Sequence, residues 1–217
     1  AVVDCTGHGV PGALMSMLAF EFLNRTIDED KFTSPKKILH KVSERLKYFA
    51  KINEVIRFRE GMDIALCYID KSRKQLYFTG ANRPLYLIRE REQSTTALNQ
   101  INPSMENSSH ALFEFKGDFQ TIDSSGAYKH FTEHKINLRP LDRLYLFTDG
   151  CVDQFGGKQD KRYKSVRLKE FLLSFSDLSL YKQAEKFESE LEGWMRLPQG
   201  NDLREQTDDI LMLGIQI

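Results

Sequence analysis

The chain has 217 residues, 41% of them hydrophobic, and its 31 basic and 31 acidic side chains cancel to a formal net charge of zero. This length is enough for one domain with a full core, and the balanced charge gives no electrostatic argument for nucleic acid or an acidic membrane as a partner. No stretch approaches the ~18 apolar residues of a membrane-spanning helix, no signal peptide opens the chain, and the three cysteines lack zinc or disulfide spacing, so we expect one cytoplasmic domain over residues 1–217.

The first 50 residues contain a strand pattern and two helical patterns. Residues 1–4 read as a strand already in progress, which predicts that the chain is a fragment of a longer protein. A helix is expected over residues 10–25, with one apolar face made of Leu14, Met17, Leu18 and Phe22. Ser34 followed by Pro35 predicts a second helix start, because serine caps the first turn and proline has no N–H to leave unpaired. Its buried face would be Ile38, Val42, Leu46 and Phe49.

Strand patterns dominate the middle of the chain. An apolar run at 64–69, a polar turn at 70–73 and an alternating run at 75–78 predict a hairpin. Further strands are expected at 85–88, 143–148 and 210–217, with weaker signals at 112–115 and 119–122. Two more helical faces occur within residues 168–175 and 184–195. This order, with helices and strands in separate blocks, favours an α+β fold over an alternating α/β fold.

The chain opens on an acidic, glycine-rich motif, Asp4-Cys5-Thr6-Gly7-His8-Gly9. It places an Asp at the end of a strand and glycines before a helix, and glycines let backbone atoms approach a ligand closely. A plain strand-to-helix turn, or a phosphate site at a helix N-terminus, would have the same pattern. The motif lacks the Lys-Ser/Thr ending of a nucleotide P-loop, which argues against that kind of site.

Two more acidic motifs border apolar strands. Asp149-Gly150 follows residues 143–148, and Asp208-Asp209 precedes residues 210–213. Each alone is most simply a turn or a solvated loop end. All three motifs together indicate one folded site. Carboxylates that converge in such a site repel each other unless a cation holds them. Carboxylate oxygens suit hard divalent ions, so the sequence predicts a binuclear metal centre and metal-assisted hydrolysis of a phosphate ester.

Five segments together resemble the stage II sporulation protein E (SpoIIE)-like branch of the PPM superfamily of metal-dependent serine/threonine phosphatases. They occur in family order and read DCTGHGVPGA (4–13), GMDIAL (61–66), YFTGANRP (77–84), LFTDG (146–150) and QTDDI (206–210). The resemblance implies a four-layer α+β fold, two stacked antiparallel β-sheets flanked by α-helices on both sides. It also implies that N-terminal strands of this fold, one of which carries a further Asp, precede the first residue of this chain.

The resemblance implies roles for individual residues. Asp4 would bridge two Mn²⁺ or Mg²⁺ ions, and the backbone carbonyl of Cys5 would complete one coordination shell. Asp149 and Asp208 would bind the second ion, with Asp209 as a neighbour. Two such ions about 3.5–4 Å apart lower the pKa of a bridging water and provide hydroxide for in-line attack on phosphorus.

Asp63 and His8 are candidates with an open alternative. Asp63 begins the strand at 64–69. It either binds a weak additional metal or hydrogen-bonds to a metal-bound water, or it is an ordinary Asp at a strand start. His8 is either the general acid for the leaving alkoxide or a loop residue that packs on backbone.

The resemblance places such domains at the end of longer signalling proteins, after sensor or receiver domains. Their partner would be a phosphorylated regulatory protein such as an anti-sigma-factor antagonist, and a homodimer stays open. Two other functions also stay open, an inactive or weakly active module with this fold that acts by protein binding, and a nucleotide-binding protein that uses the glycine turn. A run of basic residues is either a solvated face or a docking surface for an acidic or phosphorylated partner, and it comprises Lys158, Lys161, Arg162, Lys164, Arg167 and Lys169.

Overall fold

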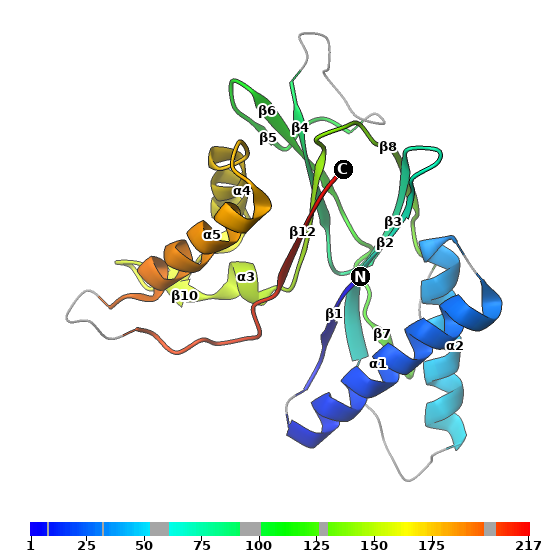
Figure 1. Cartoon of the computed structure of the whole chain (residues 1–217). Coiled ribbons are helices and arrows are strands. Elements are labelled where there is room, and N and C mark those ends of the chain that lie inside the picture. Colours follow the sequence, from blue (N-terminus) through cyan, green and yellow to red (C-terminus); the bar gives the residue numbers. More distant parts are fainter. Residues whose placement is uncertain (8, 32, 53–60, 92–100, 126–129, 198–202) are drawn as a thin grey trace. The chain divides into compact units, whose positions relative to one another are not determined.

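The computed structural model describes residues 1–7, 9–31, 33–52, 61–91, 101–125, 130–197 and 203–217 (Figure 1). These residues form two five-stranded sheets with antiparallel pairing, a two-stranded ribbon and helices, so the predicted α+β class is confirmed. Contacts group the chain into two compact units. Unit 1 contains Ala1–Leu85 and Phe115–Leu138, and unit 2 contains Tyr86–Glu114 and Arg139–Ile217.

Unit 1 is one sheet with two helices packed on it. The strand order is β1 (Val2–Cys5), β2 (Gly61–Asp70), β3 (Gln75–Ala81) and β8 (His134–Asn137), and β7 (Ile122–Asp123) also pairs with β2. The helices α1 (Gly9–Asp30) and α2 (Pro35–Ile52) lie beside these strands in Figure 1. Their apolar faces form one core with the sheet, which includes Met15, Leu39, Val42, Leu46, Met62 and Ile64. This packing fixes the strand ends that carry Asp4 and Asp63.

Unit 2 is built on the second sheet. Its strand order is β12 (Met212–Gln216), β9 (Arg143–Phe147), β4 (Leu85–Glu90), β6 (His110–Phe115) and β5 (Met105–Glu106). The short helix α3 (Gly150–Asp153) leads into the ribbon of β10 (Phe155–Gly156) and β11 (Lys161–Arg162), then α4 (Lys164–Ser174) and α5 (Leu180–Met195) follow. The core of this unit includes Tyr86, Tyr145, Tyr163, Leu168, Phe171 and Phe187.

Most predicted elements are present with shifted ends. The predicted start of the second helix is confirmed, because α2 begins at Pro35 and the backbone N–H of Lys37 donates to Ser34 Oγ at 3.4 Å. The apolar face predicted for the first helix is partly wrong, since Met17 is 69% exposed while Met15 and Ala19 are buried. The edge strand β12 pairs with β9 from Met212 onwards, two residues later than expected.

One weak strand prediction is wrong. Of residues 119–122 only Ile122 belongs to a strand, and Phe119 is fully exposed in a bend. The neighbouring Asp118 accepts hydrogen bonds from the backbone and the hydroxyl of Thr132, which favours a loop at this point. None of the described helices combines the length and the apolar composition that crossing a membrane would require.

Candidate functional site

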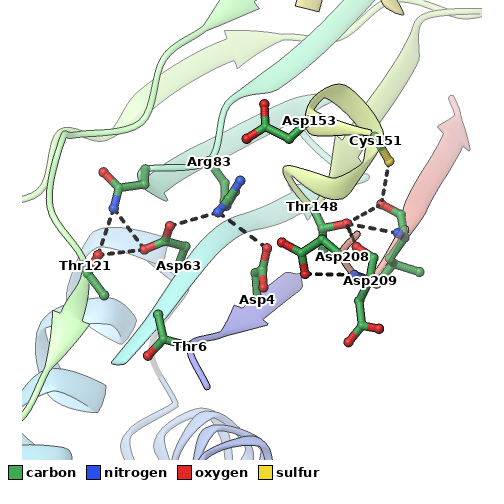
Figure 2. A network of polar contacts seen from close by, with 12 residues as sticks. Asp4, Thr6, Asp63, Arg83, Thr121, Thr148, Cys151, Asp153, Asp208 and Asp209 are labelled. Atoms are coloured by element: carbon green, nitrogen blue, oxygen red, sulfur yellow. Dashed lines mark hydrogen bonds and ion pairs between the residues drawn. The ribbon is translucent and has the colours of Figure 1, made fainter. Parts of the chain in front are cut away.

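Asp4 and Asp63 lie opposite each other in the antiparallel pairing of β1 with β2. Like charges at opposed strand positions repel each other. Arg83 offsets this repulsion, because its Nη2 atom lies 3.4 Å from Asp4 Oδ2 and 2.9 Å from Asp63 Oδ2 (Figure 2). The side chains of Asp4, Asp63 and Arg83 are only 20%, 14% and 11% exposed, respectively. Their charges therefore interact more strongly than charges at an open surface would.

A second set of contacts fixes Asp63. Its Oδ1 atom accepts hydrogen bonds from Asn82 Nδ2 and Thr121 Oγ1, each at 2.9 Å, and Asn82 Nδ2 also donates to Thr121 Oγ1 at 2.9 Å. Asn82 has a positive φ of 57° in the turn between β3 and β4, which suits asparagine better than most residues. Both carboxylate oxygens of Asp63 are therefore engaged by protein donors, and the residue holds Arg83 beside Asp4.

The glycine-rich motif is tied to the start of β2. The backbone N–H of Thr6 donates to the Gly61 carbonyl at 2.9 Å, and the Gly61 N–H donates to Thr6 Oγ1 at 2.6 Å. A Cβ at Gly12 would lie 2.6 Å from the Gly7 carbonyl oxygen, so α1 can approach the turn only with glycine there. Burial is the main cause that raises the pKa of the Cys5 thiol, which is therefore neutral at pH 7. His8 lies outside the described residues.

In unit 2, Thr148 joins the two other acidic motifs. Its Oγ1 donates to the Asp209 carbonyl at 2.8 Å and accepts from the Leu211 N–H at 3.0 Å, and its own N–H donates to the Leu211 carbonyl at 3.0 Å. Cys151 Sγ also donates to the Leu211 carbonyl at 3.4 Å. Figure 2 shows Thr148 and Cys151 directed at this segment. The segment around Asp149 and the segment around Asp209 are therefore held side by side.

The acidic side chains of unit 2 lie around this junction. Asp149 is half-buried just before α3, and its carboxylate makes no capping hydrogen bond to that helix. Asp208 and Asp209 are exposed, and Asp208 Oδ1 accepts from the Asp209 N–H at 2.8 Å. A Cβ at Gly150 would lie 2.5 Å from the Asp209 carbonyl oxygen, so the Asp-Gly motif needs its glycine for this approach.

The structure thus brings the predicted residues together in two sets, Asp4 with Asp63 in unit 1, and Asp149 with the Asp208-Asp209 segment in unit 2. Within the described part of either unit, no three His, Cys, Asp or Glu side chains form a group that could hold a metal ion. The assignment of Asp4, Asp149 and Asp208 to one centre therefore stays a prediction. The chemistry of the donors does fit hard divalent ions, because these residues offer carboxylate and backbone oxygens only.

Sequence reasoning missed three supporting residues. Arg83 and Asn82 belong to a segment that had carried the family resemblance, but a role for them depends on contacts that the sequence does not reveal. Gln154 is fully buried and links several segments of unit 2. Its Nε2 donates to the Glu205 carbonyl at 3.1 Å, its Oε1 accepts from the Thr207 N–H at 3.2 Å, and its backbone carbonyl accepts from Trp194 Nε1 at 3.0 Å. No local pattern marks such a residue in advance.

Comparison with known families gives one match that covers the whole chain. The family described as Stage II sporulation protein E (SpoIIE) matches residues 1–217. No curated protein matches the chain.

Several solved structures share the fold. The SiaA-PP2C domain of Pseudomonas aeruginosa is 28% identical with a TM-score of 0.76, over 99% of this chain and 74% of that one. The catalytic domain of the serine/threonine phosphatase PstP, in complex with two manganese ions, is 14% identical with a TM-score of 0.56, over 98% and 84% of the two chains. RsbX in complex with magnesium is 13% identical with a TM-score of 0.55, over 98% and 77%.

Proposed function

Because the chain belongs to the stage II sporulation protein E (SpoIIE) family, we propose that it is a metal-dependent phosphatase that hydrolyses phosphoserine or phosphothreonine on a regulatory protein. The serine/threonine phosphatase PstP is among its structural neighbours, which supports the reaction class. Neighbours that bind manganese or magnesium support the dependence on metal.

The carboxylates of the three acidic motifs are the proposed ligands for two Mn²⁺ or Mg²⁺ ions. Asp4 and the Cys5 carbonyl at the end of β1, together with Asp149 and Asp208, would hold the ions, and Asp209 would lie beside them. When bound, such ions supply a hydroxide nucleophile at neutral pH and neutralise the charge of the phosphate. No covalent phosphoenzyme is required.

The chain's own residues have separate tasks in this proposal. Asp63 holds Arg83 in place, as its three hydrogen-bond donors indicate, and it is then a positioning residue. The guanidinium of Arg83 puts a fixed positive charge beside Asp4, and guanidinium groups pair well with phosphate oxygens. His8 stays a predicted proton donor for the leaving alkoxide.

The observation that carries the proposal is the framework around the acidic motifs. Thr6 ties the Asp4 motif to β2, and Thr148 ties the Asp149 motif to the Asp208-Asp209 segment. Ordinary solvated loop ends need no such fixation, whereas metal ligands must be held in a defined geometry. Supporting threonines on both motifs therefore favour a functional site over three unrelated turns.

Hydrolysis of p-nitrophenyl phosphate with Mn²⁺ tests this function. We expect Asp149→Asn to lower kcat/KM by at least about 100-fold, because a lost carboxylate ligand removes much of the stabilisation that the metal provides. Asp160→Asn is the matched control in the same unit, since Asp160 is an exposed carboxylate that pairs with Arg204 at 2.8 Å. Equal rates in wild type and Asp149→Asn would remove the catalytic assignment of Asp149.

The identity of the substrate protein is proposed by resemblance only. A phosphorylated anti-sigma-factor antagonist in the cytoplasm is the type of partner that the family resemblance implies, and sensor or receiver domains upstream would regulate the activity. The structural neighbour PppA, described as a key regulatory component of T6SS in Pseudomonas aeruginosa, supports a regulatory setting.

A further inference from the structure

Unit 2 contains a basic groove beside the β10–β11 ribbon. We use the term basic groove for a depression of about 540 Å³ lined by Gly156, Gly157, Lys158, Gln159, Lys161, Arg162, Tyr163, Lys164, Arg167 and Trp194. Five of these described lining residues are cationic and none is acidic, although the whole chain has no net charge. Such a local excess of one charge marks a place where a charged ligand is attracted.

Several contacts connect the residues that form the floor of the groove. Trp194 Nε1 donates to the Gln154 carbonyl at 3.0 Å, and the Gly157 N–H donates to the Trp194 carbonyl at 2.7 Å. Gly157 has a φ of 68°, and a Cβ there would lie 2.6 Å from the Trp194 ring. Arg167 stacks on the same ring with its guanidinium carbon 4.3 Å from the ring centroid. The aromatic floor therefore holds the ribbon and the start of α4 in one fixed arrangement.

The charges of the groove are only partly neutralised. Arg162 is 3.2 Å from Asp153, and Arg167 is 3.5 Å from Glu190. Asp160, on the ribbon, pairs with Arg204. For Lys158, Lys161 and Lys164, all exposed, no ion pair occurs among the described residues. Three lysines thus leave the groove with an uncompensated positive charge.

Gln154 connects the groove to the acidic motifs of the same unit. Its carbonyl accepts from Trp194 Nε1 and from the Tyr163 N–H, which belong to the groove. Its side chain bonds the backbone of Glu205 and Thr207, which directly precede Asp208. The buried side chain of Gln154 therefore links the surface that would hold a ligand in the groove to the segment just before Asp208.

We infer that the basic groove binds an acidic segment of the phosphoprotein substrate, close in sequence to the phosphorylated residue. This inference rests on the proposed function, because a protein phosphatase must hold a protein chain while one phosphate reacts. Carboxylate side chains complement the three unpaired lysines, and the groove is short and confined to one unit. An extended nucleic acid would require a longer basic stripe.

Trp194 provides a direct test, because it is the only tryptophan in the chain. The probe is an unphosphorylated peptide with a central serine and four Glu on each side of it. The peptide is titrated into the protein without metal while tryptophan fluorescence is recorded. We expect a saturable fluorescence change that weakens with added salt, since exposed charges are screened. The same peptide with Gln in place of Glu is expected to bind at least about tenfold more weakly.

Charge reversal separates the groove from general charge effects. We expect Lys158→Glu/Lys161→Glu to reduce affinity for the Glu peptide by about tenfold or more, because attraction becomes repulsion. Lys182→Glu/Lys186→Glu on the exposed face of α5 makes the same change in net charge and is expected to stay within about twofold. With the phosphoserine form of the peptide, the groove variant should raise KM and leave p-nitrophenyl phosphate hydrolysis unchanged.

Several results would overturn the inference. These are an unchanged Trp194 signal with the Glu peptide, equal losses in both double variants, or equally tight binding of a single-stranded oligonucleotide. A chain that hydrolyses no phosphate at all would sink the proposed function instead, and the metal-free titration would still decide whether the groove binds acidic peptides.

Discussion

At the scale of single residues, Asp63 in β2 forms a charged cluster with Asp4 and Arg83. Two opposed carboxylates alone would destabilise the pairing of β1 with β2. With Arg83 between them, the cluster has one residual negative charge, on the side of Asp4. The oxygens of Asp63 already accept hydrogen bonds from Arg83, Asn82 and Thr121. Of the two carboxylates, that of Asp4 is therefore better suited to bind a cation.

Asp63→Asn tests this division of roles. The change removes the charge partner of a guanidinium that is only 11% exposed and places amide hydrogens against at least one existing donor. We expect the free energy of unfolding to fall by about 1–3 kcal/mol, measured by urea titration. Mn²⁺ affinity should also fall, because Arg83 then pairs with Asp4 alone.

The double variant Asp63→Asn/Arg83→Met is the control for charge. Because it also removes the guanidinium that has lost its nearer carboxylate partner, we expect it to regain part of the lost stability. An Asp63→Asn protein as stable as wild type would show that Asp63 does not support Arg83 energetically.

At the scale of elements, the junction between the start of α3 and the segment before β12 positions half of the predicted ligands. Thr148 supplies three of its hydrogen bonds, and the absence of a side chain at Gly150 allows the backbone contact with Asp209. The spacing of Asp149 from Asp208 and Asp209 therefore depends on backbone packing rather than on the carboxylates themselves.

Gly150→Ala should disturb this junction. The added Cβ would meet the Asp209 carbonyl oxygen at 2.5 Å, so one backbone segment must shift. We expect a loss of about 1–3 kcal/mol in the free energy of unfolding, as for other overpacked sites, together with weaker Mn²⁺ binding. Gly193→Ala in α5 is the matched control, since a Cβ there meets nothing within 4 Å.

The control should be neutral or gain up to about 1 kcal/mol, because alanine is a better helix former than glycine. Both proteins would be compared by urea unfolding and by calorimetric Mn²⁺ titration. Unchanged metal binding in Gly150→Ala would mean that the junction does not set the positions of the ligands.

Local signals explain which elements the sequence could predict. The start of α2 follows from Ser34 and Pro35, because capping involves only neighbouring residues. The orientation of α1 does not follow from spacing alone, since Met17 and Met15 fit a helical period almost equally and only packing against the sheet selects Met15. The prediction of a strand at 119–122 was wrong because the local pattern does not reveal the hydrogen bonds from Thr132 to Asp118.

The candidate site shows the same limit. The Asp4 and Asp149 motifs could be recognised from sequence because glycines and an adjacent strand mark them, and the Asp208-Asp209 motif because it precedes an apolar run. The partners of Asp63 come from Asn82, Arg83 and Thr121, up to 58 positions away, and Gln154 reaches Glu205 and Thr207 over 51 and 53 positions. Such contacts depend on strand register and tertiary packing, which one sequence does not specify.

At the scale of the whole molecule, buried tyrosines in the core of unit 2 make the stability of the protein depend on alkaline pH. Burial raises the pKa of Tyr145 to about 12, and it also raises the pKa of Tyr86 and Tyr163. All three side chains pack in the core of this unit. In the unfolded chain these phenols would ionise near pH 10.

The folded protein therefore holds these protons more tightly than the unfolded chain does. Their contribution to stability is complete below pH about 10 and decreases as the pH rises above it. The part that comes from Tyr145, roughly 3 kcal/mol, is lost as the pH rises through about 12. We expect the free energy of unfolding to fall steeply above pH 10. In Tyr145→Phe the slope of stability against pH should be smaller by about one proton over this range. An identical slope in both proteins would contradict the prediction.

The most direct test of the central claim is calorimetric titration of Mn²⁺ into wild type, Asp4→Asn and Asp149→Asn, with folding checked by circular dichroism. If the acidic motifs form one centre, wild type binds two ions, and each folded variant loses at least one of them together with phosphatase activity. Two ions bound with unchanged affinity in both variants would contradict the claim, because Asp4 and Asp149 would then hold no metal.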